Sequence, residues 1–118
     1  MLFRSVLRGP EDAEPGVWPG ANTTLVVVAT NAALTKERAN LVARAAHDGV
    51  SRAVRPAHTI WDGDTAFSLA TGEVEADQRT VEAMAEVVVA EAIRRGVLKA
   101  EGVPGFPAVR DGGEGQGT

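Results

Sequence analysis

Hydrophobic residues gather in four segments of the chain, and their spacing predicts two strands and two helices in alternation. Residues 24–30 (TLVVVAT) are apolar without alternation, which is typical of a strand with both faces covered. Residues 65–71 (TAFSLAT) alternate, with Phe67 and Leu69 on one face and small side chains on the other. We therefore expect an α/β fold in the order strand, helix, strand, helix.

Each predicted helix has a capping residue before it and a glycine after it. Thr35 is suited to cap the first helix, which is expected to run to about Asp48, with Gly49 just past its end. Asp77 is suited to cap the second helix, which Gly96 is expected to close. The expected core-facing stripes are Leu41, Val42, Ala45 and Ala46 in the first helix, and Val81, Met84, Ala85, Val88 and Ala92 in the second.

The segments between and beyond these elements carry breaker residues. Residues 50–61 contain a proline and no clean period, so we expect a loop that crosses the molecule, followed by a turn at residues 62–64. Residues 9–20 are rich in proline, glycine and acid, and residues 111–118 are mostly glycine and polar. The predicted organisation is a flexible leader over 1–21, an ordered portion over 22–110 and a disordered tail over 111–118.

Two strands are too few to make a stable sheet protein. An isolated two-stranded sheet is marginal, yet the apolar run of residues 24–30 requires cover above and below. We expect the missing cover to come from copies of this chain or from a portion of a larger fold that is encoded elsewhere.

Composition excludes several classes of function. The chain has 118 residues and a net charge of −4, which fits one domain and argues against a nucleic-acid binder. It has no cysteine, which excludes disulfides and thiolate metal sites, and only two histidines. No apolar run approaches the roughly 18 residues that span a bilayer, and arginines interrupt the first residues, so we expect a cytoplasmic protein without membrane contact.

Polar side chains with possible chemistry stand at the start of both predicted strands. Asn22 and Thr23 precede the first strand, and Asp62 and Asp64 precede the second. If both starts lie at the same end of the sheet, two carboxylates face a threonine hydroxyl. The alternative is a purely structural role, in which the threonines begin a strand and the acids form a tight turn.

A threonine at this position can act as a nucleophile. Its hydroxyl is weakly nucleophilic until a base takes its proton. A cut before Thr23 would free an α-amine with a pKa of about 7.7–8.0, which can serve as that base. Attack of Thr23 Oγ on the Asn22 carbonyl would make the cut without a protease, through an ester that water hydrolyses.

The sequence contains no convincing pattern for a metal or cofactor site. A calcium loop that starts at Asp62 would place Glu73 twelfth, but Ala66 and Phe67 fill the fifth and sixth places, where a ligand and a glycine are needed. We therefore expect no metal and no cofactor. The other candidates are expected to be structural: His47 and His58 in hydrogen bonds, Trp18 and Trp61 in packing, Arg52 and Arg55 in solvent or ion pairs.

Several short motifs together resemble a known family. The combination of NTT before a valine strand, AHDG, RPAHT and DGDT-x-F is similar to the β-subunit region of the L-aminopeptidase/D-esterase (DmpA) family, whose members are N-terminal-nucleophile hydrolases. It is most similar to the 6-aminohexanoate-oligomer (nylon-oligomer) hydrolase branch, which cuts at Asn-Thr. The resemblance covers about residues 20–111. It implies that Thr23 is the nucleophile freed by autocleavage after Asn22, and that Asp62 and Asp64 orient it.

The resemblance also implies a fold, a reaction and partners. The expected fold is the β-α-β-α portion of a four-layer αββα sandwich that assembles as oligomers. The expected function is an autoprocessing N-terminal-threonine amidohydrolase or peptidase subunit, which acts through an acyl-enzyme on small amides, peptides or 6-aminohexanoate oligomers. An acyltransferase of the ornithine acetyltransferase kind is a weaker alternative, because its usual sequence around the cleavage threonine is not seen here.

The chain departs from the family before the cleavage site. Family precursors carry a long α portion there, with a lysine and an asparagine thought to bind the nucleophile and the oxyanion, whereas 22 residues precede Thr23 here. We expect this chain to correspond to the C-terminal third of such a precursor, as a truncated reading frame or with a separate α partner. The alternative function is a non-catalytic fragment that only oligomerises or docks onto an α portion.

Overall fold

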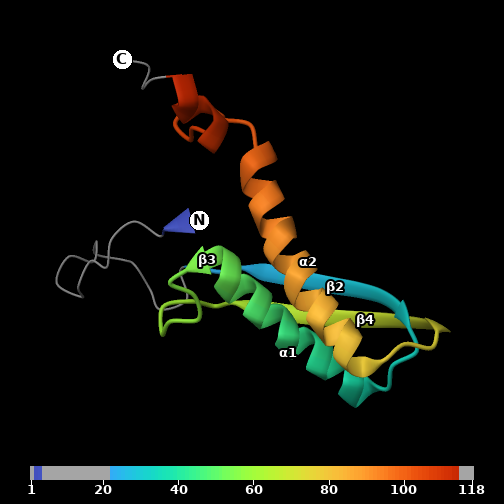
Figure 1. The fold of residues 1–118 in the computed structure, drawn as a ribbon. Coiled ribbons are helices and arrows are strands. Elements are labelled where there is room, and N and C mark those ends of the chain that lie inside the picture. Colours follow the sequence, from blue (N-terminus) through green and yellow to red (C-terminus); the bar gives the residue numbers. More distant parts are fainter. Residues whose placement is uncertain (1, 4–21, 115–118) are drawn as a thin grey trace.

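The structure is a computed structural model that describes residues 2–3 and 22–114, and it has an α/β architecture (Figure 1). The expected order of strand, helix, strand, helix is confirmed by β2, α1, β4 and α2. Trp18 and most of the predicted leader, as well as the last four residues, lie outside the described residues. The elements are β1 (Leu2–Phe3), β2 (Leu25–Ala32), α1 (Lys36–Ala53), β3 (Val54–Arg55), β4 (Thr65–Val74), α2 (Gln78–Lys99) and the 3-10 helix η2 (Val109–Glu114).

The main sheet is a parallel pair of β2 and β4, with α1 as the crossover between them. Leu25 pairs with Thr65, and the register holds to the pair of Thr30 and Ala70. It shifts after Thr30, so that Ala32 pairs with Val74. A second parallel pair joins the two-residue strands β1 and β3. Both long strands run past their predicted ends at residues 30 and 71, since β2 continues to Ala32 and β4 to Val74.

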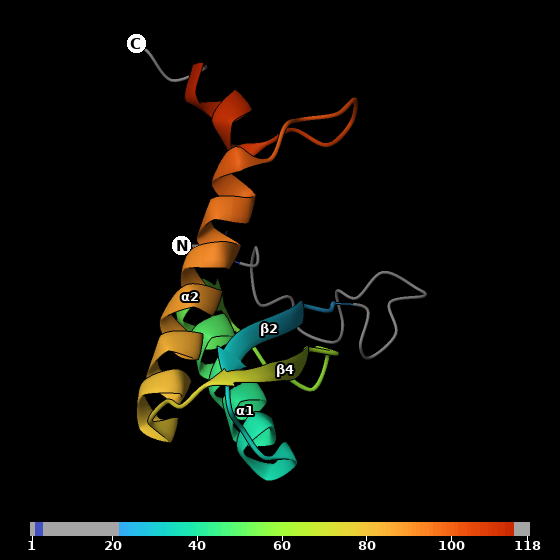
Figure 2. The same cartoon turned by 90° about the vertical axis from the view of Figure 1, so that its right-hand side faces the viewer.

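Both helices cover the same face of the sheet, which makes two layers (Figure 2). Alternate β2 side chains point into the core between the layers, where α1 and α2 also pack against each other. The buried hydrophobic residues are Val26, Val28 and Ala32 from β2, Val42, Ala46 and Val50 from α1, and Val81, Ala85 and Val89 from α2.

The opposite face of the sheet is apolar and exposed, which differs from the expectation that both faces of β2 are covered. Leu25 and Val27 of β2 are 71% and 66% exposed, and Phe67 and Leu69 of β4 are 59% and 49% exposed. We call these four residues the open sheet face. It stays open because both helices lie on the other side of the two strands and no described segment packs against it.

Gly49 lies inside α1 and does not end it, so the prediction of a helix that stops near Asp48 is wrong. The helix continues to Ala53. The glycine at position 49 lies where the two helices cross. A Cβ at Gly49 would stand 2.6 Å from the Glu86 carbonyl oxygen and 2.8 Å from Val89 Cβ. The absence of a side chain thus lets α2 approach, and the predicted loop over residues 50–61 begins only after β3.

The end and the buried stripe of α2 also differ from expectation. Asp77 caps the helix as predicted, since its side chain accepts a hydrogen bond from Thr80 N, but Gly96 lies within the helix and Ala100 caps it. The buried stripe steps by four through Val81, Ala85 and Val89. Met84, Val88 and Ala92 are exposed, because they lie outside the stripe of α2 that packs into the core, and Val88 and Ala92 line a hollow beside β2. In α1, Leu41 is likewise exposed. Residues 111–114, expected as tail, belong to η2.

Candidate active site

The two polar groups singled out in the sequence lie at the same end of the sheet, where both strands begin. Asn22 and Asp62 form a parallel bridge, and Thr65 N donates to the Thr24 carbonyl at 3.0 Å. Thr24 and Asp64 are forty positions apart, as are Leu25 and Thr65, so the strand register continues into the polar segments without a slip. We call residues 22–24 and 62–64 the strand mouth.

Asp64 holds the strand mouth together through both carboxylate oxygens. Oδ1 accepts a hydrogen bond from Thr24 N at 2.9 Å, which ties β2 to the start of β4. Oδ2 accepts from His58 N at 3.1 Å and lies 2.9 Å from His58 Nδ1. The Asp64 side chain is only 4% exposed, so its charge depends on these partners.

These contacts make Asp64 more acidic than usual. Burial pushes the pKa of its carboxyl upward, but the hydrogen bonds from the His58 and Thr24 backbones and the charge of His58 outweigh burial and lower the pKa. Asp64 is therefore a carboxylate at neutral pH, held in a fixed orientation beside Thr24.

Asp62 closes the short loop that leads into the site. Its Oδ2 accepts from Thr59 N at 2.9 Å and from Thr59 Oγ1 at 2.7 Å, and its own N–H donates to the Thr59 carbonyl at 3.0 Å. This arrangement fixes the backbone just before Gly63. Asp62 thus shapes the edge of the strand mouth that faces Asn22.

The peptide bond between Asn22 and Thr23 is at the surface, since both residues are exposed. The Asn22 carbonyl accepts a hydrogen bond from Gly63 N at 2.7 Å. A threonine hydroxyl adjacent to an exposed, polarised carbonyl is the combination that an intramolecular attack requires. All four predicted site residues, Asn22, Thr23, Asp62 and Asp64, are therefore brought to one edge of the molecule.

His58 is part of this arrangement, although sequence reasoning treated it as a generic structural histidine. Its φ of 56° lies in the left-handed region, which lets its backbone N–H and its ring reach the same Asp64 oxygen. Its Nε2 lies 3.1 Å from the His47 carbonyl, and the two imidazole rings meet edge to face at 4.8 Å. Both ring nitrogens face acceptors, so only the doubly protonated ring donates to both.

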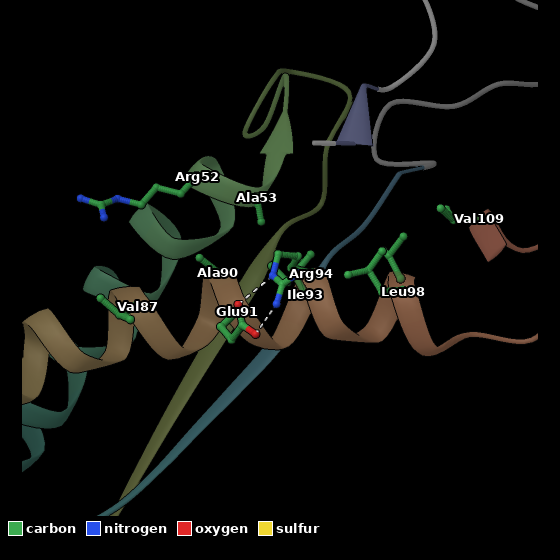
Figure 3. A pocket seen from close by; sticks show the side chains of 10 residues that line it. Arg52, Ala53, Val87, Ala90, Glu91, Ile93, Arg94, Leu98 and Val109 are labelled. Carbon is green, nitrogen blue, oxygen red and sulfur yellow. Dashed lines mark hydrogen bonds and ion pairs between the residues drawn. The ribbon is translucent and has the colours of Figure 1, made fainter. Parts of the chain in front are cut away.

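A mainly apolar hollow among the described residues lies away from the strand mouth. It has a volume of about 560 Å³ and is formed by the end of α1, the C-terminal half of α2 and η2 (Figure 3). Its walls are mainly apolar, with an ion pair between Glu91 and Arg94 on one side. No residue of the strand mouth lines it, so we do not assign the chemistry to this hollow.

The described part of the chain contains neither a cluster of metal-ligating side chains nor a helix that could span a membrane. Residues 2–3 and 22–114 contain no group of three or more histidine, aspartate or glutamate side chains that could hold a metal ion. Among their helices, neither α1 nor α2 combines the length and the apolar character needed to cross a bilayer.

Comparisons with known proteins identify the family to which this chain is similar. The model of Peptidase family S58 matches residues 4–110. A protein named as an uncharacterized aminopeptidase from Mycobacterium tuberculosis (strain ATCC 25618 / H37Rv) is 42% identical over 105 residues, which cover 76% of this chain and 30% of that protein. A similarly named protein from Mycobacterium leprae is 45% identical over 101 residues, covering 73% of this chain and 28% of that protein.

A third relative carries a more specific name. The 6-aminohexanoate-oligomer endohydrolase of Paenarthrobacter ureafaciens is 34% identical over 61 residues, which cover 52% of this chain and 17% of that protein. This chain thus spans less than a third of the length of each of these curated relatives.

Proposed function

Because this chain belongs to peptidase family S58, we propose that it is the nucleophile-bearing part of a peptidase-type hydrolase. In the proposed reaction the chain first cuts itself between Asn22 and Thr23, and the new N-terminal threonine then attacks amide bonds. The substrates are small amides, peptides or 6-aminohexanoate oligomers, the classes suggested by the names of the relatives. A cytoplasmic location remains a prediction.

The self-cleavage proceeds in two steps. Thr23 Oγ attacks the Asn22 carbonyl carbon, the C–N bond breaks, and the hydroxyl proton moves to the departing nitrogen, which leaves an ester between Asn22 and Thr23 Oγ. Water then hydrolyses this ester, so that Asn22 ends in a carboxylate and Thr23 regains its hydroxyl, while the nitrogen freed in the first step remains as its α-amine.

Turnover then uses the groups that the cut has freed. The Thr23 amine takes the hydroxyl proton as Oγ attacks the substrate carbonyl, and it returns the proton to the leaving amine. Water hydrolyses the resulting acyl-enzyme. Asp64 holds the Thr24 backbone next to the nucleophile, and Asp62 fixes the facing loop, so both acids act as positioning groups.

One observation carries the proposal: the exposed Asn22–Thr23 bond lies at the same sheet edge as the Asp62–Asp64 pair, in unbroken register. In the sequence these groups are separated by β2, α1 and β3.

Intact mass tests the first step. The purified chain is incubated at neutral pH, and we expect a product that begins at Thr23, with hydroxylamine accelerating its release because it cleaves esters. Thr23→Ala is expected to abolish the cut, since no nucleophile remains.

Thr24→Ala is the matched control, because it removes the neighbouring hydroxyl and keeps the backbone N–H that Asp64 binds. It should slow the cut and not abolish it. If Thr23→Ala is still cut while Thr24→Ala is not, the nucleophile has been assigned to the wrong threonine.

The second candidate function is a non-catalytic fragment that oligomerises or docks onto an α portion. The open sheet face favours it, because four large apolar side chains there lack cover among the described residues. In this case the chain keeps its original N-terminus after long incubation, alone and together with an α portion. The proposed partners are an α portion of the same family or further copies of this chain.

A further inference from the structure

We propose that the backbone N–H of Gly63 is the oxyanion donor for self-cleavage at the Asn22–Thr23 bond. The inference rests on the proposed self-cleavage and assigns a catalytic group to it within this chain. Gly63 N donates to the Asn22 carbonyl oxygen at 2.7 Å, and this oxygen belongs to the bond that would break. As Thr23 Oγ adds to the carbonyl carbon, the negative charge of the intermediate develops on that same oxygen.

The geometry meets the requirement for such a donor. An oxyanion donor acts best when it lies 2.7–3.1 Å from the position that the oxyanion will occupy and needs no reorganisation as charge develops. The Asn22 oxygen stays bonded to the same carbon as it becomes the oxyanion, and it already accepts from Gly63 N at 2.7 Å before the attack. The Gly63 N–H is fixed on both sides, because Asp62 is tied to Thr59 before it and Asp64 is tied to Thr24 and His58 after it. The donor is thus set in place by the fold before the reaction begins.

Strand register explains why this donor faces this carbonyl. In a parallel pair, a residue of one strand is bonded by the N–H of the residue that follows its partner. Asn22 pairs with Asp62, so its carbonyl meets the N–H of the next residue, Gly63. The Thr65 N–H meets the Thr24 carbonyl in the same way, one rung further into the sheet.

The two carboxylates beside Gly63 do not cancel this effect. A bare carboxylate would repel a developing oxyanion, but the Asp64 oxygens are already bonded by Thr24 N and by the backbone and ring of His58. Asp62 Oδ2 is bonded by the Thr59 backbone and hydroxyl. The acids hold the N–H in place, and these donors stabilise both oxygens of Asp64 and Oδ2 of Asp62.

The test replaces one backbone N–H by oxygen. Because the chain has no cysteine, it can be assembled by ligation at alanines 53 and 66 followed by desulfurisation, with an ester in place of the amide at Gly63. The control carries the same change at Thr65, which removes the neighbouring ladder bond without touching the Asn22 carbonyl. Urea unfolding of both analogues shows whether they lose similar stability.

We expect the Gly63 ester to slow self-cleavage by about 10²–10³-fold, the usual cost of one lost oxyanion donor. The Thr65 ester should stay within a few-fold of the unmodified chain. If the Gly63 ester cuts at the unmodified rate, or if both esters slow the cut equally, the assignment of the donor is overturned while the self-cleavage stands.

A second readout does not depend on cleavage. In the Thr23→Ala background, a ¹³C=¹⁸O label at Asn22 reports the hydrogen bond through the carbonyl stretch, which should move to higher wavenumber in the Gly63 ester and stay unchanged in the Thr65 ester. An unchanged stretch in the Gly63 ester overturns the donor directly. If the unmodified chain never cuts, the proposed function fails, and the catalytic role of Gly63 fails with it.

Discussion

At the scale of single residues, Asp64 shows how a site can be held together by one carboxylate. It joins the backbone of β2, through Thr24, to the loop residue His58. The proximity of the acids to Thr23 could be anticipated, because parallel neighbouring strands begin at the same end of a sheet. The contact of His58 with Asp64 could not be predicted, because it depends on a positive φ at His58 that no sequence pattern indicates.

The lowered pKa of Asp64 predicts a pH dependence of stability. A carboxyl that is more acidic in the folded than in the unfolded chain favours folding when ionised. Its contribution is therefore complete above the usual value of 3.8 and is lost as pH falls through the lower folded pKa. We expect Asp64→Asn to lower the free energy of unfolding at pH 7 by about 1–3 kcal/mol and to flatten its decline in acid.

Urea unfolding between pH 7 and pH 2.5 measures both effects. Glu91→Gln is the control, because the pKa of Glu91 is also lowered, by its hydrogen bond with Arg94, but the pair is exposed on α2. A change in Glu91→Gln as large as that in Asp64→Asn would show that the buried contacts of Asp64 have no special weight.

At the scale of elements, the starts of the two helices could be predicted from the sequence, but their ends could not. Caps and apolar spacing located the starts of both helices, with Thr35 and Asp77 as predicted. Gly49 and Gly96 were both expected as helix ends, because a glycine at a helix crossing and a glycine past a helix end look alike in sequence. The packing of α2 over α1 accounts for Gly49, whereas Gly96 lies inside α2 with no close neighbour.

Alanine substitutions at the two glycines should have opposite effects. In Gly49→Ala the new Cβ meets the Glu86 carbonyl and Val89, so we expect a loss of about 1–3 kcal/mol in unfolding free energy. Gly96→Ala meets nothing within 4 Å and should gain about 0.5–1 kcal/mol through helix propensity. Thermal and urea unfolding measure both, and equal effects would contradict the helix crossing at Gly49.

At the scale of the whole molecule, the two layers leave the open sheet face without cover. The apolar run in β2 correctly indicated a need for cover on two sides, but a single sequence cannot say which chain provides it. Exposure of four large apolar side chains on one flat surface is typical of an interaction site.

We expect the isolated chain to self-associate through this face. Replacing Val27 and Phe67 together by serine should shift it toward monomer in size-exclusion chromatography with light scattering, because both side chains are exposed and little folding energy is lost. The control replaces Met84 and Val87, which are exposed on α2 and do not line the hollow beside β2, by serine. If only the control pair changes the mass, association uses the helix and not the sheet.

The constant register at the strand mouth has a consequence for engineering. The scissile bond and the residues opposite it are aligned by the pairing of the two strand starts and by the Asp64 carboxylate, so their alignment does not depend on how many residues the crossover contains. A crossover helix lengthened or shortened by whole turns, or replaced by one from another protein, would leave the reacting groups face to face. If the chain were cut within the crossover, self-cleavage at Asn22–Thr23 would occur only after the two separate fragments had associated.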